Sequence, residues 1–477
     1  MRVTAAVPAG GTNLISQRNR NCMGLIIKDV DFLFIYEHRN REMDSICLLG
    51  AYLETKGYRV GYVNTWDSMF HVHPEYRTKV ILVPACYRSG PYAFFTGFAM
   101  SFEKVVNLQW EQVIMNGVVY SGDKTDWDYN GEALVTRHVC WGENDRDYLH
   151  NRFGMDYSMM RVCGYLPLDF YREELRGATS KRDELFSRYG LDPNRKTLLF
   201  ISSFAEAGKP LAEAAVVDGD EEESRENIRM QEKSQEILLD WFRQLLRDEE
   251  GLQIIYRPHP AEAKNPEFLK RAREIRDFHV IQQESIRNWI LNCDILCNWQ
   301  STAMIELYAA KKKSLILRPI RIPFKRAMPI FDEGHFRAVT SYEELLQEVR
   351  EEHPVFPVEE ERLLQFYSIE EQPAYERVGR YLIDTLNDPE YHSRDIGGHV
   401  TPKGRIIHRA LAWKNVMKAR AAHSARKLSG NGEQRPDADE NYIQNSYYYQ
   451  MMRQNRISRR ELRRQIDSYK DLITKKV

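Results

Sequence analysis

Short apolar runs alternate with amphipathic segments of helix length between residues 31 and 317. Apolar runs that stop abruptly at polar groups are typical of strands buried on both faces of a sheet. The pattern predicts six strands in the first half of this region, and they are Phe32–Tyr36, Tyr58–Val63, Val80–Val83, Lys104–Leu108, Arg137–Trp141 and Arg161–Gly164. It predicts five more in the second half, and they are Thr197–Ser202, Gln253–Arg257, Phe278–Gln282, Asp294–Asn298 and Ser314–Leu317.

The segments between these strands are long enough for crossover helices, which predicts parallel rather than hairpin pairing. After the first strand, Ile46, Leu49 and Leu53 share one helical face, with Asp44 as the expected N-cap and Gly57 as the stop. A chain of 477 residues also exceeds what one hydrophobic core accommodates. We therefore expect an α/β fold in which two Rossmann-like parallel-sheet domains face each other across a cleft, followed by C-terminal helices.

Changes in composition along the chain predict the domain boundaries. Residues 1–28 form a flexible leader, 29–175 the first Rossmann-like domain, 190–345 the second, 346–428 a helical extension, 429–441 a linker and 442–477 a basic helical tail. A polar, acidic insertion at roughly residues 205–227 interrupts the second domain and is expected to be mobile. No apolar run approaches the length of a membrane span.

The formal net charge of −1 identifies no partner, but charge is unevenly distributed. Residues 396–432 contain eight lysines or arginines and no acidic residue, and residues 441–477 contain nine basic and three acidic residues. These basic C-terminal helices could contact anionic lipid peripherally. The alternative is a solvated helical face neutralised by the acidic region 343–376. Nucleic acid is not expected as a partner, because no aromatic-plus-basic sheet motif or reading helix is recognisable.

Seven cysteines without a CxxC pair indicate reduced, cytosolic usage rather than a disulfide framework or a zinc site. We expect no metal centre and no cofactor. Two Asp-X-Asp matches are interpreted as coincidence, because the one at residues 218–220 lies in the acidic insertion and the one at 126–128 is isolated. The absence of a GxGxxG, a Walker A or a GxSxG sequence removes support for kinase and hydrolase chemistry.

The strongest chemical signal is a strand that ends in Arg257-Pro-His259-Pro, with Glu262 just beyond. The two prolines fix the backbone, and therefore the directions of the Arg257 and His259 side chains. A guanidinium can bind a phosphate through two N–H groups, and an imidazole can donate to the same group or to a departing phosphate. The alternative is a strand end whose arginine pairs with a surface carboxylate. We expect phosphate binding.

The strand expected at residues 294–298 runs directly into a helix. Ser301 and Thr302 are expected at its N-cap, where backbone N–H groups and two hydroxyls would bind a diphosphate. Glu306 lies one turn further along the same face and could accept hydrogen bonds from ribose hydroxyls. A capping box is the alternative, and it would require the cap at position 303. With Asn298 and Gln300, these residues form the second half of the expected donor site.

Six of the eight residues from 37 to 44 are ionisable, and they follow the first strand. A carboxylate at this position could act as general base for an acceptor hydroxyl, with Glu42 as the first candidate and Glu37 or Glu111 as the next. Arg41 and Trp110 complete the expected acceptor side, because the indole offers a stacking surface for a sugar. The alternative is a solvated turn with no chemical role.

Several of these motifs resemble a known family. Arg41-Glu-Met-Asp44, Gly57-Tyr-Arg-Val60, His138-Val-Cys-Trp-Gly142 and Gly164-Tyr-Leu-Pro-Leu-Asp169, together with Arg257-Pro-His259-Pro and Ser301-Thr302…Glu306, are similar to segments of bacterial capsule and lipopolysaccharide biosynthesis proteins. These are GT-B-type glycosyltransferases related to Kdo transferases and CDP-glycerol polyol-phosphate transferases. The resemblance covers roughly residues 31–317 and implies a GT-B-like, metal-independent cytoplasmic enzyme with the nucleotide on its second domain and the acceptor on its first. The acidic insertion, the basic tail and Trp299-Gln300 depart from the family pattern.

The sequence therefore predicts transfer of a sugar from a nucleotide-activated donor to a surface polysaccharide or glycolipid. Arg257, His259 and the helix start at 301–302 would stabilise the departing phosphate, and Glu306 would hold ribose. Three alternatives stay open: a CDP-polyol phosphotransferase, a sugar-nucleotide 2-epimerase, and a non-catalytic scaffold of a glycan assembly complex.

Overall fold

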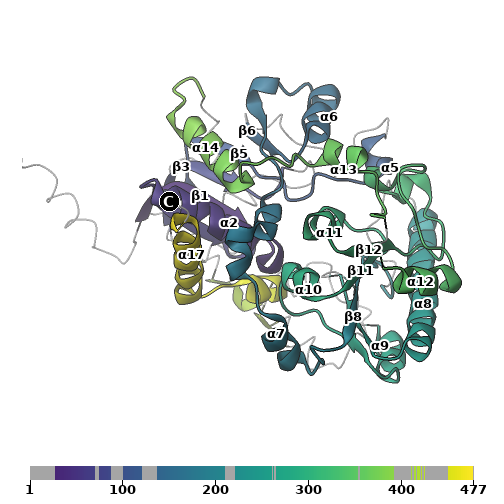
Figure 1. Ribbon diagram of the computed structural model, residues 1–477. Coiled ribbons are helices and arrows are strands. Elements are labelled where there is room, and N and C mark those ends of the chain that lie inside the picture. Colours follow the sequence, from purple (N-terminus) through teal and green to yellow (C-terminus); the bar gives the residue numbers. More distant parts are fainter. Residues whose placement is uncertain are drawn as a thin grey trace, which may run out of the picture.

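A computed structural model of the chain describes most of the expected elements (Figure 1). It covers residues 27–69, 75–86, 100–120, 137–209, 221–259, 262, 265–352, 355–391 and 449–475, with scattered positions between 410 and 424. The expected leader up to residue 26, the expected linker and both Asp-X-Asp matches lie outside the described residues, whereas residues 27 and 28 of the expected leader already belong to a strand.

The first sheet has the strand order β2-β1-β3-β5-β6-β7, with β4 beside β3, and every pairing in it is parallel. Residues 32–36 of its strand β1 form a continuous apolar run because both faces of the sheet are covered there. Phe32 and Phe34 lie in one core cluster, and Leu33 and Ile35 lie in another on the opposite face. The strands are β1 (Ile27–Tyr36), β2 (Val60–Asn64), β3 (Glu75–Val83), β4 (Met100–Ser101), β5 (Lys104–Asn107), β6 (Arg137–Cys140) and β7 (Met160–Val162).

The second sheet is also wholly parallel, in the order β10-β9-β8-β11-β12. Its strands are β8 (Lys196–Ile201), β9 (Leu252–Arg257), β10 (Phe278–Val280), β11 (Ile295–Asn298) and β12 (Lys313–Ile316). All eleven expected strands are confirmed. Among the residues that the structure describes, the one strand missed is the two-residue β4, which is too short to show a pattern. The expected α/β class with two parallel sheets is confirmed.

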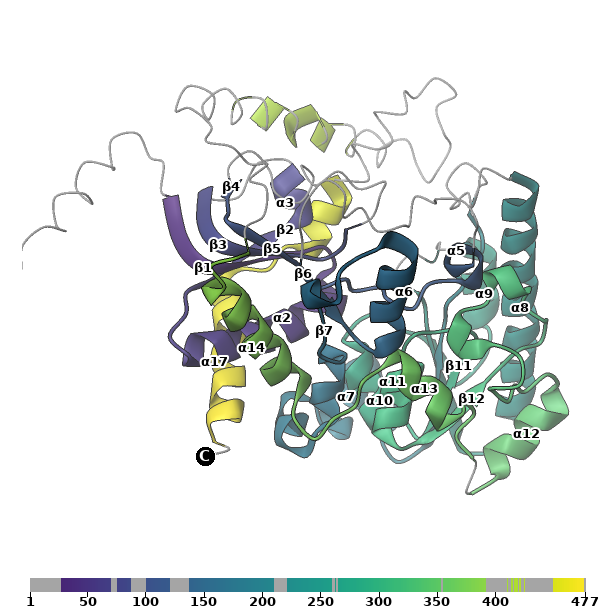
Figure 2. The same ribbon diagram turned by 90° about the horizontal axis from the view of Figure 1, so that it is seen from above.

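Helices connect the strands and cover both sheets (Figures 1 and 2). The α-helices are α2 (Arg39–Thr55), α3 (Thr65–Met69), α5 (Asn116–Val119), α6 (Glu143–Phe153), α7 (Arg182–Tyr189), α8 (Glu221–Asp248), α9 (Pro266–Arg273), α10 (Ile286–Asn292), α11 (Met304–Ala310), α12 (Tyr342–Arg350), α13 (Glu360–Phe366), α14 (Ala374–Asn387) and α17 (Arg459–Thr474). The 3₁₀ turns are η1 (Tyr157–Met159), η2 (Leu166–Tyr171), η3 (Glu173–Ala178), η5 (Phe324–Arg326) and η6 (Pro329–Phe331).

Two helix starts differ from the sequence-based expectation. The acidic run Glu221–Glu223 was expected in a mobile insertion, but it forms the first turn of the 28-residue helix α8. Carboxylates are favourable there because they face the positive end of the helix dipole. Asp44 was expected as an N-cap, but α2 already begins at Arg39. Asp44 lies inside that helix and accepts hydrogen bonds from Gln465 and Tyr469.

The last described segments return to the first domain, which the sequence did not predict. Helix α14 packs on α2 so closely that a Cβ on Gly379 would lie 2.4 Å from the ring of Tyr52. Asp169 fixes the start of α14, because its carboxylate accepts the backbone N–H groups of Ala374 at 2.9 Å and Tyr375 at 2.7 Å. Burial raises the pKa of Asp169 to about 6, whereas these bonds and Arg172 oppose that rise.

The C-terminal segment 449–475 holds the turn between β1 and α2. The side-chain oxygen of Asn455 accepts a hydrogen bond from the backbone N–H of Arg39 at 2.8 Å. The backbone carbonyl of Asn455 accepts one from the hydroxyl of Tyr36 at 3.2 Å. Arg463 and Lys470 of α17 form ion pairs with Glu54 at the far end of α2. Part of the positive charge of the basic tail is therefore neutralised by the first domain, not by the acidic region that the sequence suggested.

We expect Asp169→Ala to destabilise the protein by roughly 3 kcal/mol, because two backbone N–H groups at the buried start of α14 would lose their acceptor. Thermal and urea unfolding measure the change. The matched control is Asp384→Ala on the same helix, which removes only a surface ion pair with Arg161 and should cost less than about 1 kcal/mol. Equal losses in the two variants would contradict the anchoring role.

Candidate functional site

Sheet topology indicates where a ligand would bind on each domain. In an open parallel sheet, ligands bind beyond the carboxyl ends of the strands, where the strand order reverses. In the first sheet the strand order reverses between β1 and β3, and Glu37 and His38 are the residues that come directly after β1 at this point. In the second sheet the reversal lies between β8 and β11, followed by Ser202 and Asn298–Gln300. We call residues 37–42 and 108–111 the first edge, and residues 202–203, 257–262 and 298–306 the second edge.

The two edges lie against each other. The charges of Arg41 and Glu111, from the first edge, act on the imidazole of His259 on the second. His259 in turn acts on His38. Direct hydrogen bonds also join the domains, since Asn116 donates to Asp332 at 2.8 Å and Tyr171 donates to Glu306 at 3.1 Å. The segments that the sequence selected from both domains therefore converge in space.

Glu42 is an anchor of the first edge. Its carboxylate accepts the backbone N–H groups of Glu37 at 2.8 Å and His38 at 3.2 Å, and the guanidinium of Arg41 at 2.9 Å. The side chain is fully buried. Burial raises the pKa of Glu42, and Arg41 with the two N–H groups opposes that rise. A carboxylate used in this way fixes the turn between β1 and α2, and it has no exposed oxygen for an acceptor hydroxyl.

Glu37 is a partly exposed carboxyl of the first edge. Its side chain is 30% exposed and lies 3.7 Å from Arg41. Burial and the neighbouring carboxylates of Glu42 and Glu111 raise its pKa to about 7, against the opposing charge of Arg41. A group that titrates near neutral pH can both accept and return a proton. Glu111 is more exposed and forms an ion pair with Arg41.

Trp110 does not offer the stacking surface that we expected. Its backbone N–H donates to the carbonyl of Pro84 at 3.0 Å, which turns the chain back over the sheet after β5. The indole packs in the hydrophobic core of the first domain and is 5% exposed. This position on the acceptor side therefore supports the fold and does not face a sugar.

Arg257 extends from the end of β9 into the second edge. It donates to the carbonyls of Gln283 at 2.8 Å and Glu284 at 2.7 Å, which hold the guanidinium in one orientation. Burial lowers its pKa to about 10, so it stays protonated at neutral pH. A guanidinium carries five N–H groups, so these two bonds leave donors for an anion.

His259 and Glu262 form one structural unit. Glu262 accepts the backbone N–H of His259 at 3.0 Å, the hydroxyl of Tyr256 at 2.7 Å and that of Ser202 at 2.6 Å. It also accepts from Gln235 at 2.8 Å. Glu262 therefore fixes the turn that carries His259 instead of reaching a ligand. Burial lowers the pKa of His259 to about 4, so its imidazole is neutral at pH 7.

The loop from β11 to α11 differs from the expected helix cap. The N-cap is Ala303, and Ser301 accepts the backbone N–H of that residue at 3.2 Å. The carbonyl of Thr302 accepts the Tyr367 hydroxyl at 3.4 Å. Gln300 donates to the carbonyl of Arg326 at 2.9 Å, and Asn298 is fully buried behind it. Asn298 and Gln300 thus support the loop from inside, while Ser301 and Thr302 remain partly exposed.

Glu306 lies in a buried group of phenols that the sequence did not reveal. It accepts from Tyr171, and its charge acts on Tyr165 and Tyr367. Burial raises the pKa of Glu306 to about 7, although the Tyr171 bond, Arg287 and Arg257 oppose that rise. The sequence pointed to Tyr165 only through the family resemblance of the segment Gly164-Tyr-Leu-Pro, and that resemblance gave the tyrosine no role. The charge of Arg41 also acts on the pKa of Tyr165, so this group of phenols connects the two edges.

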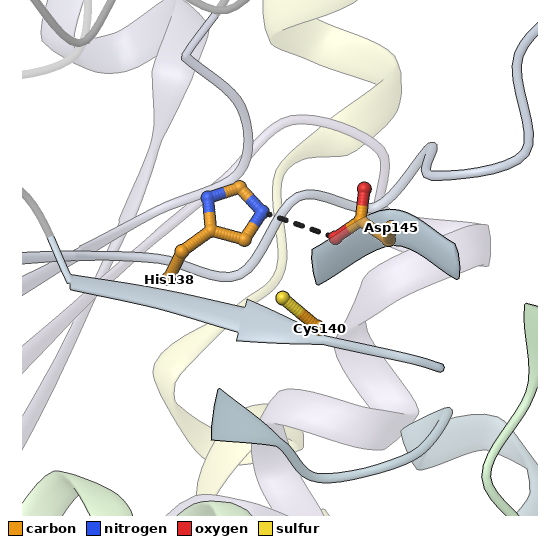
Figure 3. Close-up of side chains that lie close together, drawn as sticks. All are labelled: His138, Cys140 and Asp145. Atoms are coloured by element: carbon orange, nitrogen blue, oxygen red, sulfur yellow. Dashed lines mark ion pairs between the residues drawn. The ribbon is translucent and has the colours of Figure 1, made fainter. Parts of the chain in front are cut away.

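A separate group on β6 and α6 has the composition of a metal site (Figure 3). His138, Cys140 and Asp145 bring their ligand atoms within 4.8 Å of one another. The amide of Asn107 is oriented by the backbone N–H of Gln109 at 3.0 Å, and it donates to Nδ1 of His138 at 3.2 Å. The imidazole proton is therefore on Nε2, which faces Asp145 at 3.6 Å.

A metal bound by this group would have to displace protons. A metal needs an unprotonated imidazole nitrogen and a thiolate. Burial, followed by the charge of Asp145, raises the pKa of Cys140 well above its usual value, so the thiol keeps its proton. His138, Cys140 and Asp145 form a buried polar network that packs α6 on β6.

Comparisons with known proteins find structural neighbours only. No family model and no curated protein matches the chain. A UDP co-structure of S. aureus MnaA is 15% identical, covers 75% of this chain and 97% of its own, and has a TM-score of 0.47. The wall teichoic acid polymerase TagF is 11% identical, with 75% and 88% coverage and a TM-score of 0.45. Methanocaldococcus jannaschii UDP-GlcNAc 2-epimerase, with UDP-GlcNAc and UDP, is 12% identical, with 75% and 99% coverage and a TM-score of 0.45. Because these sequence identities are so low, the activity of this chain has to be inferred from the residues of the two edges.

We expect a nucleoside diphosphate to raise the pKa of His259 by about one unit or more, because a bound anion stabilises the imidazolium. Affinity should then increase as pH falls from the raised pKa toward about 4. NMR titration of ¹³C-labelled histidines with and without UDP or CDP measures the shift, and loss of the signal in His259→Gln assigns it. The exposed His335 is the internal control. An unchanged His259 pKa at nucleotide saturation would contradict this role.

Proposed function

We propose that the protein transfers a sugar from a nucleotide-activated donor to a hydroxyl of a surface polysaccharide or glycolipid. The observation that carries the proposal is the approach of Arg41 and Glu111 on one domain to His259 on the other. Glu37 lies beside Arg41, and Arg257 and Glu306 lie on the same second edge as His259. This arrangement combines cationic and N–H donors for phosphate with a carboxyl group that titrates near neutral pH.

The donor would lie on the second edge. As the bond between the anomeric carbon and the phosphate oxygen breaks, negative charge develops on the departing nucleotide. Arg257 and the N–H of neutral His259 are positioned to stabilise it, and preorganised donors of this kind usually provide the largest part of the acceleration. Ser301 and Thr302 would contact the same phosphates, and Glu306 would accept from ribose. Because arginine supplies the positive charge, we expect turnover to persist in EDTA.

The acceptor would lie on the first edge, with Glu37 as its general base. Glu37 would remove the proton of the attacking hydroxyl while the hydroxyl oxygen forms the new bond to the anomeric carbon. Glu42 was the first candidate from the sequence, but its two oxygens already accept two N–H groups and a guanidinium. Glu37 has both the exposure and the raised pKa that the step requires.

A sugar-nucleotide 2-epimerase is the second candidate. Two carboxyl groups with pKa values of about 7, Glu37 and Glu306, lie on opposite domains. Such a pair can remove a proton from one face of a carbon and return it to the other. Products separate the candidates: a transferase releases nucleotide, an epimerase releases none, and a CDP-polyol phosphotransferase adds phosphate to its acceptor.

The proposed location is the cytoplasmic side of a membrane, where a glycolipid acceptor would be accessible. Within the part of the chain that the structure describes, no helix combines the length and apolarity needed to cross a bilayer. The six described cysteines are free and buried, which suits a reducing compartment. A peripheral contact of the C-terminal helices with the membrane belongs to the same proposal.

We expect Arg257→Ala and Glu306→Ala each to weaken nucleotide binding by about tenfold or more, the usual cost of a lost hydrogen bond to a charged group. Isothermal titration with UDP, CDP and GDP measures the affinity, and thermal melting confirms folding. The control is Arg276→Ala, which removes a 95% exposed arginine two residues before β10. Unchanged affinity in both site variants would exclude the second edge as the donor site.

We expect Glu37→Gln to retain donor affinity and to lower turnover by about 100-fold or more, because an amide cannot accept the proton. In the native protein, turnover should rise with pH through about 7 as Glu37 loses its proton, and the variant should lack this rise. Glu103→Gln, an exposed carboxylate elsewhere on the same domain, is the control. A variant with native turnover and an unchanged pH profile would exclude Glu37 as the base.

A further inference from the structure

A helical stretch between residues 410 and 424 lies on the first domain. Its described positions are 410, 413, 414, 416–418, 420, 421 and 424, and all of them are helical. Val416 packs against a small cluster formed by Trp66, Tyr449 and Met452. This contact holds the helical stretch beside α3 and the segment 449–455, next to the first sheet (Figure 2).

Trp413 and Met417 are exposed on this helix. Trp413 is 69% exposed and Met417 is 42% exposed. They are four residues apart, so they are neighbours on one face. The six other tryptophans that the structure describes are all at most 8% exposed, which makes Trp413 an exception in this molecule. Exposed apolar surface flanked by polar residues marks an interaction site.

Basic side chains flank this apolar face. At about 100° per residue, with Met417 at the centre, Trp413 lies about 40° and Arg420 about 60° to one side. Lys414 lies about 60° and Lys418 about 100° to the other side, and all three basic residues are exposed. The surrounding sequence, 396–432, contains no aspartate or glutamate to neutralise them. A Trp-containing apolar face bordered by lysine and arginine is the pattern of a helix that lies in a membrane interface.

We propose that this helix docks the protein on an anionic phospholipid surface. Trp413 and Met417 would insert at the level of the headgroups, and Lys414, Lys418 and Arg420 would pair with lipid phosphates. A second copy of the chain is the less favourable occupant, because a two-fold contact would place the same cationic face against itself. Helix α17, the other basic segment, is less suitable since Arg463 and Lys470 pair with Glu54.

The docking surface has a physical connection to the first edge. Val416 packs on Tyr449 and Met452, and the same segment continues to Asn455, which holds the backbone of Arg39 next to Glu37. The docking surface rests on the membrane contact proposed above, but its test needs neither donor nor acceptor, so it can fail while the proposed transfer activity stands.

The test is co-sedimentation of the full chain with vesicles of phosphatidylcholine, with and without phosphatidylglycerol. We expect binding to the anionic vesicles only, weakening as salt rises. Each basic residue near such a surface contributes a factor of roughly five, so Lys414→Glu with Lys418→Glu should lower partitioning by about 25-fold or more. Trp413→Ser with Met417→Ser should lower it by about tenfold or more through loss of the apolar contact.

Matched controls are Val355→Ser, which removes a hydrophobic side chain that is 80% exposed in another part of the protein, and Lys233→Glu on α8. Both should bind as the native chain does, and all variants should melt alike because the changed residues are exposed. Equal binding to neutral and anionic vesicles, no binding to either, or native binding by either double variant would overturn the proposal. So would a dimer in vesicle-free solution that Trp413→Ser with Met417→Ser converts to monomer, because the face would then join two copies.

Discussion

Parallel strand pairing is the constraint on which the rest of the structure depends. Because every described pairing in both sheets is parallel, the polar residues that follow each strand gather at a single edge of each sheet. The reversal of strand order then marks the point on each edge where a ligand would bind. Arg257 and Glu306, which are distant in sequence, act on each other in the second domain because both follow strands of one parallel sheet.

Three carboxylates, two of them buried and one partly buried, maintain the geometry that the parallel sheets create. Glu42 holds the turn after β1, Glu262 the turn after β9, and Asp169 the start of α14. Each accepts backbone N–H groups, whose loss at a buried site costs a few kcal/mol. Their use as anchors separates them from Glu37 and Glu306, whose pKa values near 7 suit proton exchange. Carboxyl groups of one chemical type thus serve two purposes, according to what surrounds them.

The sequence was sufficient for the sheets and insufficient for the roles of individual residues. Strands buried on both faces are continuous apolar runs, so all eleven could be located from local pattern. Arg257 and His259 could be selected because they follow such a run directly. Glu42 and Glu37 could not be distinguished, since only the fold shows which carboxylate accepts the N–H groups of the turn. Trp110 was misplaced because a backbone bond to Pro84, distant in sequence, turns its ring inward.

The chain completes its first domain last. Ile466 and Tyr469, close to the C-terminus, pack in the same core as Phe32 and Ile46. The first sheet and α14 cover other parts of α2, but the face that meets α17 stays uncovered until residues 459–474 have been made. Closing a loop of more than 400 residues between Glu54 and Arg463 makes this docking a late and slow step of folding. The second sheet, whose five strands lie between residues 196 and 316, needs no closure of this length and can form earlier.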